Sequence, residues 1–143
     1  MKILWVEDHP RANELLVAAG AAASRKRLGM DIVVAGSLLE AERKLRLERF
    51  DLVIADLFLP DSADEDVTVT RLANMGQFRV AVVSASDRRQ DVVESLRRGG
   101  VDCAPVAVGK EDLDLGDFVR DPAKLRAFVD SLMPAADEQL EAS

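Results

Sequence analysis

The chain has 143 residues, of which 48% are hydrophobic and 31% are charged. This length and composition are typical of one globular domain and exclude a wholly disordered chain. The net charge is −7, and an acidic surface repels phosphate backbones, so we do not expect direct nucleic-acid binding. A single cysteine, Cys103, excludes an intrachain disulfide and argues against a cysteine-based zinc site.

Neither a secretion signal nor a membrane span is expected. The N-terminal segment MKILWVED becomes acidic too early for a signal peptide. The longest run without a charged residue, between Glu14 and Arg25, is much shorter than a membrane-spanning helix. We therefore predict a soluble, cytoplasmic protein that does not bind membranes.

Short apolar runs alternate with stretches of helical periodicity along the chain. In chain order, the pattern predicts a strand at 2–6, a helix at 10–28, a strand at 31–35, a helix at 38–48 and a strand at 51–57. The pattern then predicts a helix at 67–75, a strand at 79–84, a helix at 88–98, a weak strand at 104–108 and a helix at 122–133.

Several of these boundaries carry their own signals. Gly29 is predicted to end the first helix. Ser37 and Glu40 have the spacing of a capping box at the start of the second helix. Asp87 and Asp121 are predicted to cap the last two helices.

Alternating strands and helices with apolar strands predict an α/β fold: a doubly wound, five-stranded parallel sheet with helices on both faces. We expect one domain over residues 1–134. Residues 135–143 are predicted to form a disordered acidic tail.

Polar side chains follow four of the predicted strands. Glu7 and Asp8 end the first strand, Asp56 lies at the end of the third, Ser84 ends the fourth, and Lys110 follows the fifth. Ligands of such sheets bind beyond the carboxyl ends of the strands, so we expect these side chains to converge.

Converging carboxylates repel one another unless a cation joins them. Mg²⁺ takes oxygen ligands, usually one or two carboxylates together with phosphate oxygens. One carboxylate can then act as a nucleophile toward a phosphoryl group, while a hydroxyl and an ammonium stabilise the transferred oxygens.

The segments ILWVEDHP, DLVIADLFLP and VAVVSAS resemble the signature of the response-regulator receiver domain, the CheY-like (flavodoxin-like) fold. The resemblance covers about residues 2–133. It implies that Asp56 is the phosphoacceptor, that Ser84 is the switch hydroxyl and that Lys110 pairs with the phosphoryl oxygens. Ser86 is a competing hydroxyl.

The same resemblance implies a metal site and a set of partners. Mg²⁺ would be held by Glu7, Asp8, Asp56 and the backbone carbonyl of Phe58. A histidine kinase or phosphotransfer protein would donate the phosphoryl group, and a target protein would bind near the helix at 88–98 and the fifth strand. The implied protein is a single-domain response regulator that catalyses its own phosphorylation and dephosphorylation.

Three features depart from the family pattern. Lysine is expected near Ala107, about three residues before Lys110, and no proline follows Lys110. The fifth strand carries no switch aromatic, since the chain has no tyrosine. The segment from Lys110 to Arg120 is longer and more acidic than usual.

These departures keep two alternatives open. The first is a pseudo-receiver, a binding module that works without phosphorylation. The second is an anion or nucleotide sensor that uses the arginine pairs Arg88–Arg89 and Arg97–Arg98.

Overall fold

Five parallel strands form one sheet in the order β2-β1-β3-β4-β5. The strands are β1 (Lys2–Val6), β2 (Asp31–Ala35), β3 (Leu52–Ala55), β4 (Arg79–Ser84) and β5 (Val108–Gly109). The predicted fold class is therefore confirmed. This computed structural model describes residues 1–62 and 64–134, the side chain of Asp66 excepted, so the predicted tail at 135–143 lies outside the described residues.

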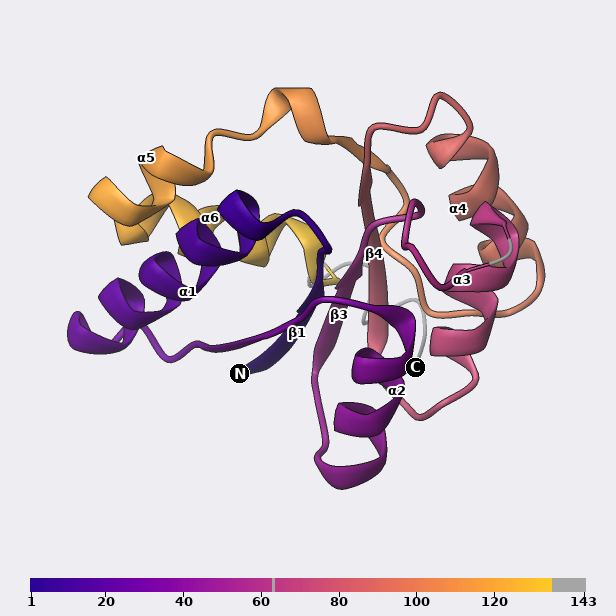
Figure 1. Cartoon of the computed structure of the whole chain (residues 1–143), viewed down its shortest axis with the longest axis horizontal. Coiled ribbons are helices and arrows are strands. Elements are labelled where there is room, and N and C mark those ends of the chain that lie inside the picture. The colour runs from indigo at the N-terminus through magenta and orange to yellow at the C-terminus, as the bar shows by residue number, and fades with distance from the viewer. Residues whose placement is uncertain (63, 135–143) are drawn as a thin grey trace.

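Helices cover both faces of the sheet (Figure 1). They are α1 (Pro10–Arg25), α2 (Leu38–Leu47), α3 (Glu65–Ala73), α4 (Arg89–Arg98), α5 (Leu115–Arg120) and α6 (Pro122–Leu132), with a 3-10 turn at Lys110–Asp112. The α1, α5 and α6 helices pack on one face, and α2, α3 and α4 pack on the other.

Successive strand residues serve the two faces in turn because side chains alternate across a strand. In β1, Ile3 and Trp5 join the core under α1 and α6, while Leu4 and Val6 join the core under α2. Both faces are covered, which is why the central strands are continuous apolar runs.

The predicted fifth strand at 104–108 is wrong in its extent. Ala104 still donates to the Val80 carbonyl (2.8 Å), but residues 105–107 leave the sheet and pairing resumes only at Val108 opposite Val83. Pro105 has no amide hydrogen to give to a ladder, which favours the departure at this point.

Several predicted helix boundaries also move by one to three residues. The first helix ends at Arg25 instead of Leu28, because Arg27 (φ 55°) closes it in the left-handed conformation instead of Gly29. The third helix begins at Glu65, two residues early, because the Asp64 carboxylate accepts from the Val67 amide (2.8 Å).

The fourth helix begins at Arg89, and its predicted cap is wrong. The Ser86 hydroxyl, not the Asp87 carboxylate, accepts a backbone hydrogen bond at this end, from the Arg88 amide at 3.1 Å.

The long connection after Lys110 contains the extra helix α5. Phe118 of α5 packs on Phe128 of α6, with ring centroids 5.6 Å apart, and Phe128 in turn stacks on Trp5 of β1. The atypical segment is therefore part of the core beneath α1.

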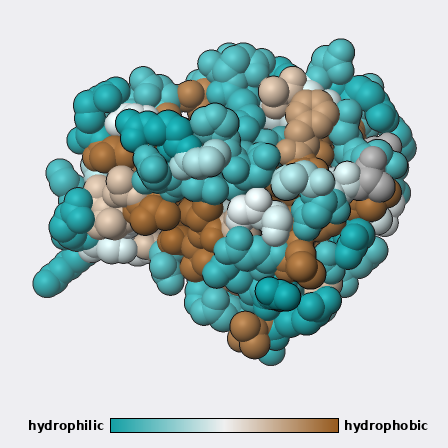
Figure 2. All heavy atoms as spheres, viewed as in Figure 1, coloured by the Kyte–Doolittle hydropathy of each residue, from teal (hydrophilic) through white to brown (hydrophobic). Residues whose placement is uncertain are grey.

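The face seen in Figure 2 is mostly hydrophilic. Hydrophobic side chains gather along β2, the strand at the edge of the sheet, where Ile32, Val33 and Val34 are half-buried.

Candidate functional site

The predicted site residues lie together at the carboxyl edge of the sheet. Glu7 and Asp8 follow β1, Asp56 follows β3, Ser84 ends β4 and Lys110 follows β5. Parallel strands present their carboxyl ends at one edge, so four short segments far apart in sequence reach one place.

Asp56 is buried, with 4% of its surface exposed. Its Oδ1 accepts from the Ser84 hydroxyl (3.0 Å) and from the Phe58 amide (3.1 Å), while its Oδ2 accepts from Lys110 Nζ (2.9 Å). The two carboxylate oxygens thus face three donors, one of them charged. This is the kind of environment that can bind the oxygens of a phosphoryl group attached to the carboxylate.

Lys110 also forms an ion pair with Glu7, so one ammonium joins two buried carboxylates. Burial raises the pKa of Glu7, and the Lys110 ammonium partly offsets the rise. Burial lowers the pKa of Lys110, but its hydrogen bonds to Glu7 and Asp56 outweigh that effect and leave this pKa above its ordinary value. Lys110 is therefore a permanent positive charge in the site at neutral pH.

Three carboxylates form a cluster that fits a hard cation. Glu7, Asp8 and Asp56 each offer an oxygen within 4.8 Å of the others' oxygens, and only Asp8 is exposed. An all-oxygen donor set with one solvent-facing carboxylate suits Mg²⁺, which keeps several of its waters. The role predicted for the Phe58 carbonyl stays a prediction; the Phe58 amide is the group that contacts Asp56.

A cavity of about 80 Å³ lies beside these charged groups. Its apolar lining includes Trp5, Leu16 and Leu113. The low polarity of this wall is consistent with the raised pKa of Glu7, because burial disfavours the charged carboxylate.

Ser84 and Ser86 are both buried but have different surroundings. Ser84 Oγ donates to Asp56 and accepts from the Ser86 amide (3.2 Å). The Ser86 hydroxyl instead contacts the Glu65 carboxylate at the start of α3. The structure therefore brings Ser84 to Asp56 and directs the Ser86 hydroxyl away from it.

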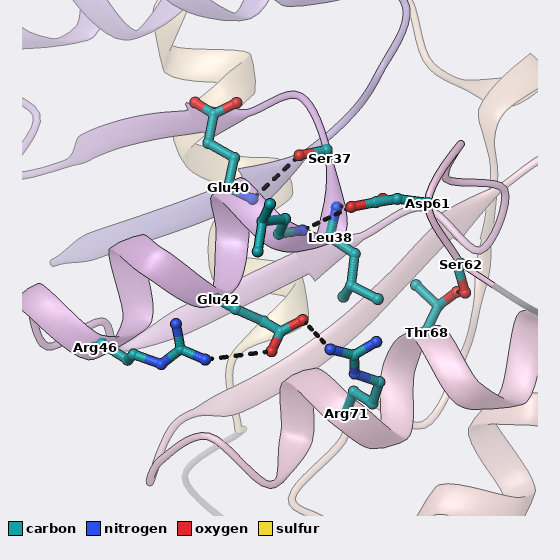
Figure 3. A network of polar contacts seen from close by, with 10 residues as sticks. Ser37, Leu38, Glu40, Glu42, Arg46, Asp61, Ser62, Thr68 and Arg71 are labelled. Carbon is teal, nitrogen blue, oxygen red and sulfur yellow. Dashed lines mark hydrogen bonds and ion pairs between the residues drawn. The ribbon is translucent and has the colours of Figure 1, made fainter.

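The loop after Asp56 is tied to the neighbouring helix α2. The Asp61 carboxylate accepts from the amides of Leu38 (2.8 Å) and Leu39 (2.9 Å), which caps α2 from outside (Figure 3). Sequence reasoning missed this cap, because a residue 22 or 23 positions away in sequence gives no local signal.

The arginine pair at the start of α4 is engaged with the protein. Arg89 donates to the Ser86 carbonyl (3.0 Å) and pairs with Glu111 (3.3 Å). Arg88 also has interactions of its own. These contacts concern the first arginine pair only; Arg97 and Arg98 at the end of α4 are exposed, and the anion-sensor alternative stays a prediction.

No protein-family model matches the sequence. The response regulator PilR of Pseudomonas aeruginosa is 30% identical over 112 residues, covering 76% of this chain and 24% of PilR. The transcriptional regulator CitB of Klebsiella pneumoniae is 28% identical over 127 residues, covering 87% of this chain and 53% of CitB.

Among solved structures, the BeF3-activated N-terminal receiver domain of Klebsiella pneumoniae RstA has a TM-score of 0.58 and 25% identity. The match covers 90% of this chain and 95% of that domain. The chain is a CheY-like receiver domain. The resemblance of the three strand-end segments is thereby confirmed.

This receiver domain spans about a quarter of PilR and about half of CitB. Within residues 1–62 and 64–134, no helix is long and apolar enough to cross a membrane.

Proposed function

We propose that this receiver domain is phosphorylated on Asp56 and acts as the response regulator of a two-component phosphorelay. The observation that carries the proposal is the arrangement of Ser84, the Phe58 amide and Lys110 around the Asp56 carboxylate. The relationship to PilR and CitB, both named as regulators, supports the same function.

The donor in this proposal is a phosphohistidine on a histidine kinase or phosphotransfer protein. An Asp56 carboxylate oxygen attacks phosphorus, and an O–P bond forms as the P–N bond to the imidazole breaks. The electron pair of the broken bond stays on the imidazole nitrogen, which takes up a proton. The Asp56 acyl phosphate is later hydrolysed by water.

The residues around Asp56 would stabilise the phosphoryl oxygens in different ways. Lys110 supplies a fixed positive charge, and Ser84 and the Phe58 amide supply hydrogen-bond donors. Glu7, Asp8, Asp56 and the Phe58 carbonyl would hold Mg²⁺. When bound, this ion neutralises charge on the phosphoryl oxygens.

Phosphorylation would bias a conformational equilibrium through Ser84. Its hydroxyl lies between Asp56 and the Ser86 amide, and Ser86 leads into α4. Movement of Ser84 toward the phosphoryl group therefore alters the turn before α4. We propose that α4 and β5 form the face that binds a target protein, and that the protein works in the cytoplasm.

The test is the intact-protein mass after incubation with Mg²⁺ and a small acyl-phosphate donor. A phosphoryl adduct is expected on the wild type and not on Asp56→Asn. Asp31→Asn, at the opposite edge of the sheet, is the matched control and is expected to keep the adduct. Absence of an adduct with both acyl-phosphate and phosphohistidine donors would overturn the proposal in favour of a phosphorylation-independent binding module.

A further inference from the structure

Lys110 reaches Asp56 only because the chain before it makes an excursion from the sheet. Val80 pairs with Cys103, and three residues later along β4, Val83 pairs with Val108. The partner segment advances five residues over the same stretch. Two extra residues are therefore accommodated in the loop at 105–107, which we call the 105–107 loop, and Lys110 is brought back into reach of the site.

The 105–107 loop is held by one side chain of α4. Gln90 Nε2 donates to the Pro105 carbonyl (2.9 Å), and Gln90 Oε1 accepts from the Ala107 amide (2.8 Å). Pro105 and Val106 are exposed, Val106 by 66%, whereas Ala107 is half-buried against the core under α4. The Gln90 side-chain amide thus hydrogen-bonds to both the first and the last residue of the loop, through its nitrogen and its oxygen.

Arg89, the residue before Gln90, contacts the chain on the C-terminal side of Lys110. Arg89 pairs with Glu111, the residue after Lys110, while its second nitrogen donates to the Ser86 carbonyl. The packing here is tight, since a Cβ on Gly109 would lie 2.9 Å from Arg89 Nη2 and 2.5 Å from Glu111 Oε1. The first turn of α4 therefore contacts the chain on both sides of Lys110.

We propose that Gln90, assisted by Arg89, is a positioning residue that sets the register of Lys110 relative to Asp56 and Glu7. The inference deepens the proposed phosphorylation site, on which its consequence for phosphoryl transfer rests. The positioning of Lys110 by Gln90 can be tested separately from that function, because the accessibility of the Lys110 ammonium can be measured without phosphorylation.

The primary test measures the reactivity of Lys110 toward an amine-labelling reagent, by peptide mass spectrometry, with exposed Lys26 as internal reference. Gln90→Met keeps the side-chain length and removes both hydrogen bonds to the loop. Two lost hydrogen bonds correspond to about a tenfold shift in the equilibrium between held and released loop. We expect Lys110 labelling to rise by up to that factor and phosphorylation by a small acyl phosphate to slow.

Gln77→Met is the matched control, since Gln77 is exposed at the amino end of β4, far from the site. It is expected to leave Lys110 labelling and phosphorylation unchanged. Equal labelling of Lys110 in Gln90→Met and Gln77→Met would overturn the inference. Thermal unfolding of each variant identifies any general loss of structure, and Arg89→Met replaces Gln90→Met should the latter fail to fold.

A rescue variant separates positioning from general destabilisation. Deleting Val106 and Ala107 in the Gln90→Met background removes the two extra residues. Regular pairing of the fifth strand with β4 should then place Lys110 at the site without the hydrogen bonds of Gln90. Recovery of low Lys110 labelling is expected, and a failure to recover it would contradict the register argument. If no phosphorylation is detected in the wild type or in any variant, while Lys110 labelling changes as expected, the phosphorylation proposal is refuted and the positioning role of Gln90 stands.

Discussion

At the scale of single residues, the site is an electrostatic balance between three carboxylates and one ammonium. Lys110 pairs with Glu7 and Asp56 at the same place where the carboxylates of Glu7, Asp8 and Asp56 would hold a cation. Lys110 and a divalent ion therefore act on the same negative charge. This makes the lysine both a stabiliser of the ion-free site and a competitor for its ligands.

Replacing Lys110 is expected to separate these two effects. In Lys110→Met the negative charge of the cluster is no longer offset, so Mg²⁺ should bind more tightly, by about tenfold for a charge of this proximity in a partly solvated site. Phosphorylation by an acyl phosphate should slow at the same time. Calorimetric Mg²⁺ titration measures the first effect, and weaker binding by the variant would contradict it.

Cys103 is expected to be inert in the folded protein. Burial raises the pKa of its thiol to about 11, and the side chain is 3% exposed. At pH 8 only roughly one molecule in a thousand then carries the reactive thiolate. A disulfide-exchange reagent should react slowly with the native chain and rapidly in denaturant. Rapid reaction of the native protein would show that Cys103 opens to solvent.

At the scale of elements, the loop that follows the phosphoacceptor also caps α2. Ser37 accepts from the Glu40 amide (3.1 Å), as the capping-box prediction requires, but the Glu40 carboxylate turns back to the Gly36 amide (2.9 Å) instead of Ser37. Asp61 supplies the remaining acceptor for the helix start, as Figure 3 shows. Glu42, further along α2, pairs with Arg71 of α3 (2.6 Å) and strengthens the same contact between elements.

Removing the Asp61 cap should destabilise the domain in a pH-dependent way. Burial alone would raise the pKa of Asp61, but the amides of Leu39 and Leu38 outweigh it and lower this pKa below 3.8. A lowered pKa in the folded state means that the carboxylate stabilises the fold above about pH 4 and that the effect disappears as pH falls through the lowered pKa. Asp61→Ala should therefore cost about 1 kcal/mol at pH 7.

Urea unfolding at pH 7 and at pH 3 measures this cost. The difference between wild type and Asp61→Ala should shrink at the lower pH, because the Asp61 carboxyl of the unfolded chain binds a proton there more readily than that of the folded protein. Asp31→Ala, an exposed carboxylate outside any cap, is the control. A difference that is the same at both pH values would show that the charge of Asp61 is not responsible.

At the scale of the whole molecule, the sheet has hydrophobic clusters on both of its faces, one under α1 and α6 and two under α2, α3 and α4. Alternate residues of β1, β3 and β4 enter the core under α1 and α6 or the cores under α2, α3 and α4. Loss of one face exposes the other side of the same strands, so the described residues are expected to unfold as one cooperative unit.

Two leucines test this expectation. Leu125 of α6 is fully buried, whereas Leu47 at the end of α2 is 82% exposed. Leu125→Ala should cost about 2–5 kcal/mol, and Leu47→Ala less than about 0.5 kcal/mol. Fluorescence of the single tryptophan, Trp5, and far-ultraviolet circular dichroism should follow one transition in each variant. Separate transitions would indicate that the two faces unfold independently.

Local patterns in the sequence were enough to predict the fold class and which side chains meet at the carboxyl edge of the sheet. Apolar runs of strand length alternate with helical periodicity, and residues at strand ends are neighbours at the edge of any parallel sheet. Glu7, Asp8, Asp56 and Ser84 directly follow or end strands whose apolar pattern is unmistakable. Their convergence therefore depends on strand order alone.

The position of Lys110, the cap on α2 and the ends of the fifth strand were decided by the tertiary structure. Hydrogen bonds between residues distant in sequence lie at each of these places: Gln90 with the 105–107 loop that precedes Lys110, and Asp61 with the amides of Leu38 and Leu39. No local propensity encodes such a bond, because the partners become neighbours only after the helices have packed on the sheet. The sequence by itself determined which chemical groups follow the strands, whereas the tertiary structure decided that Lys110, despite its shifted register, pairs with both Glu7 and Asp56.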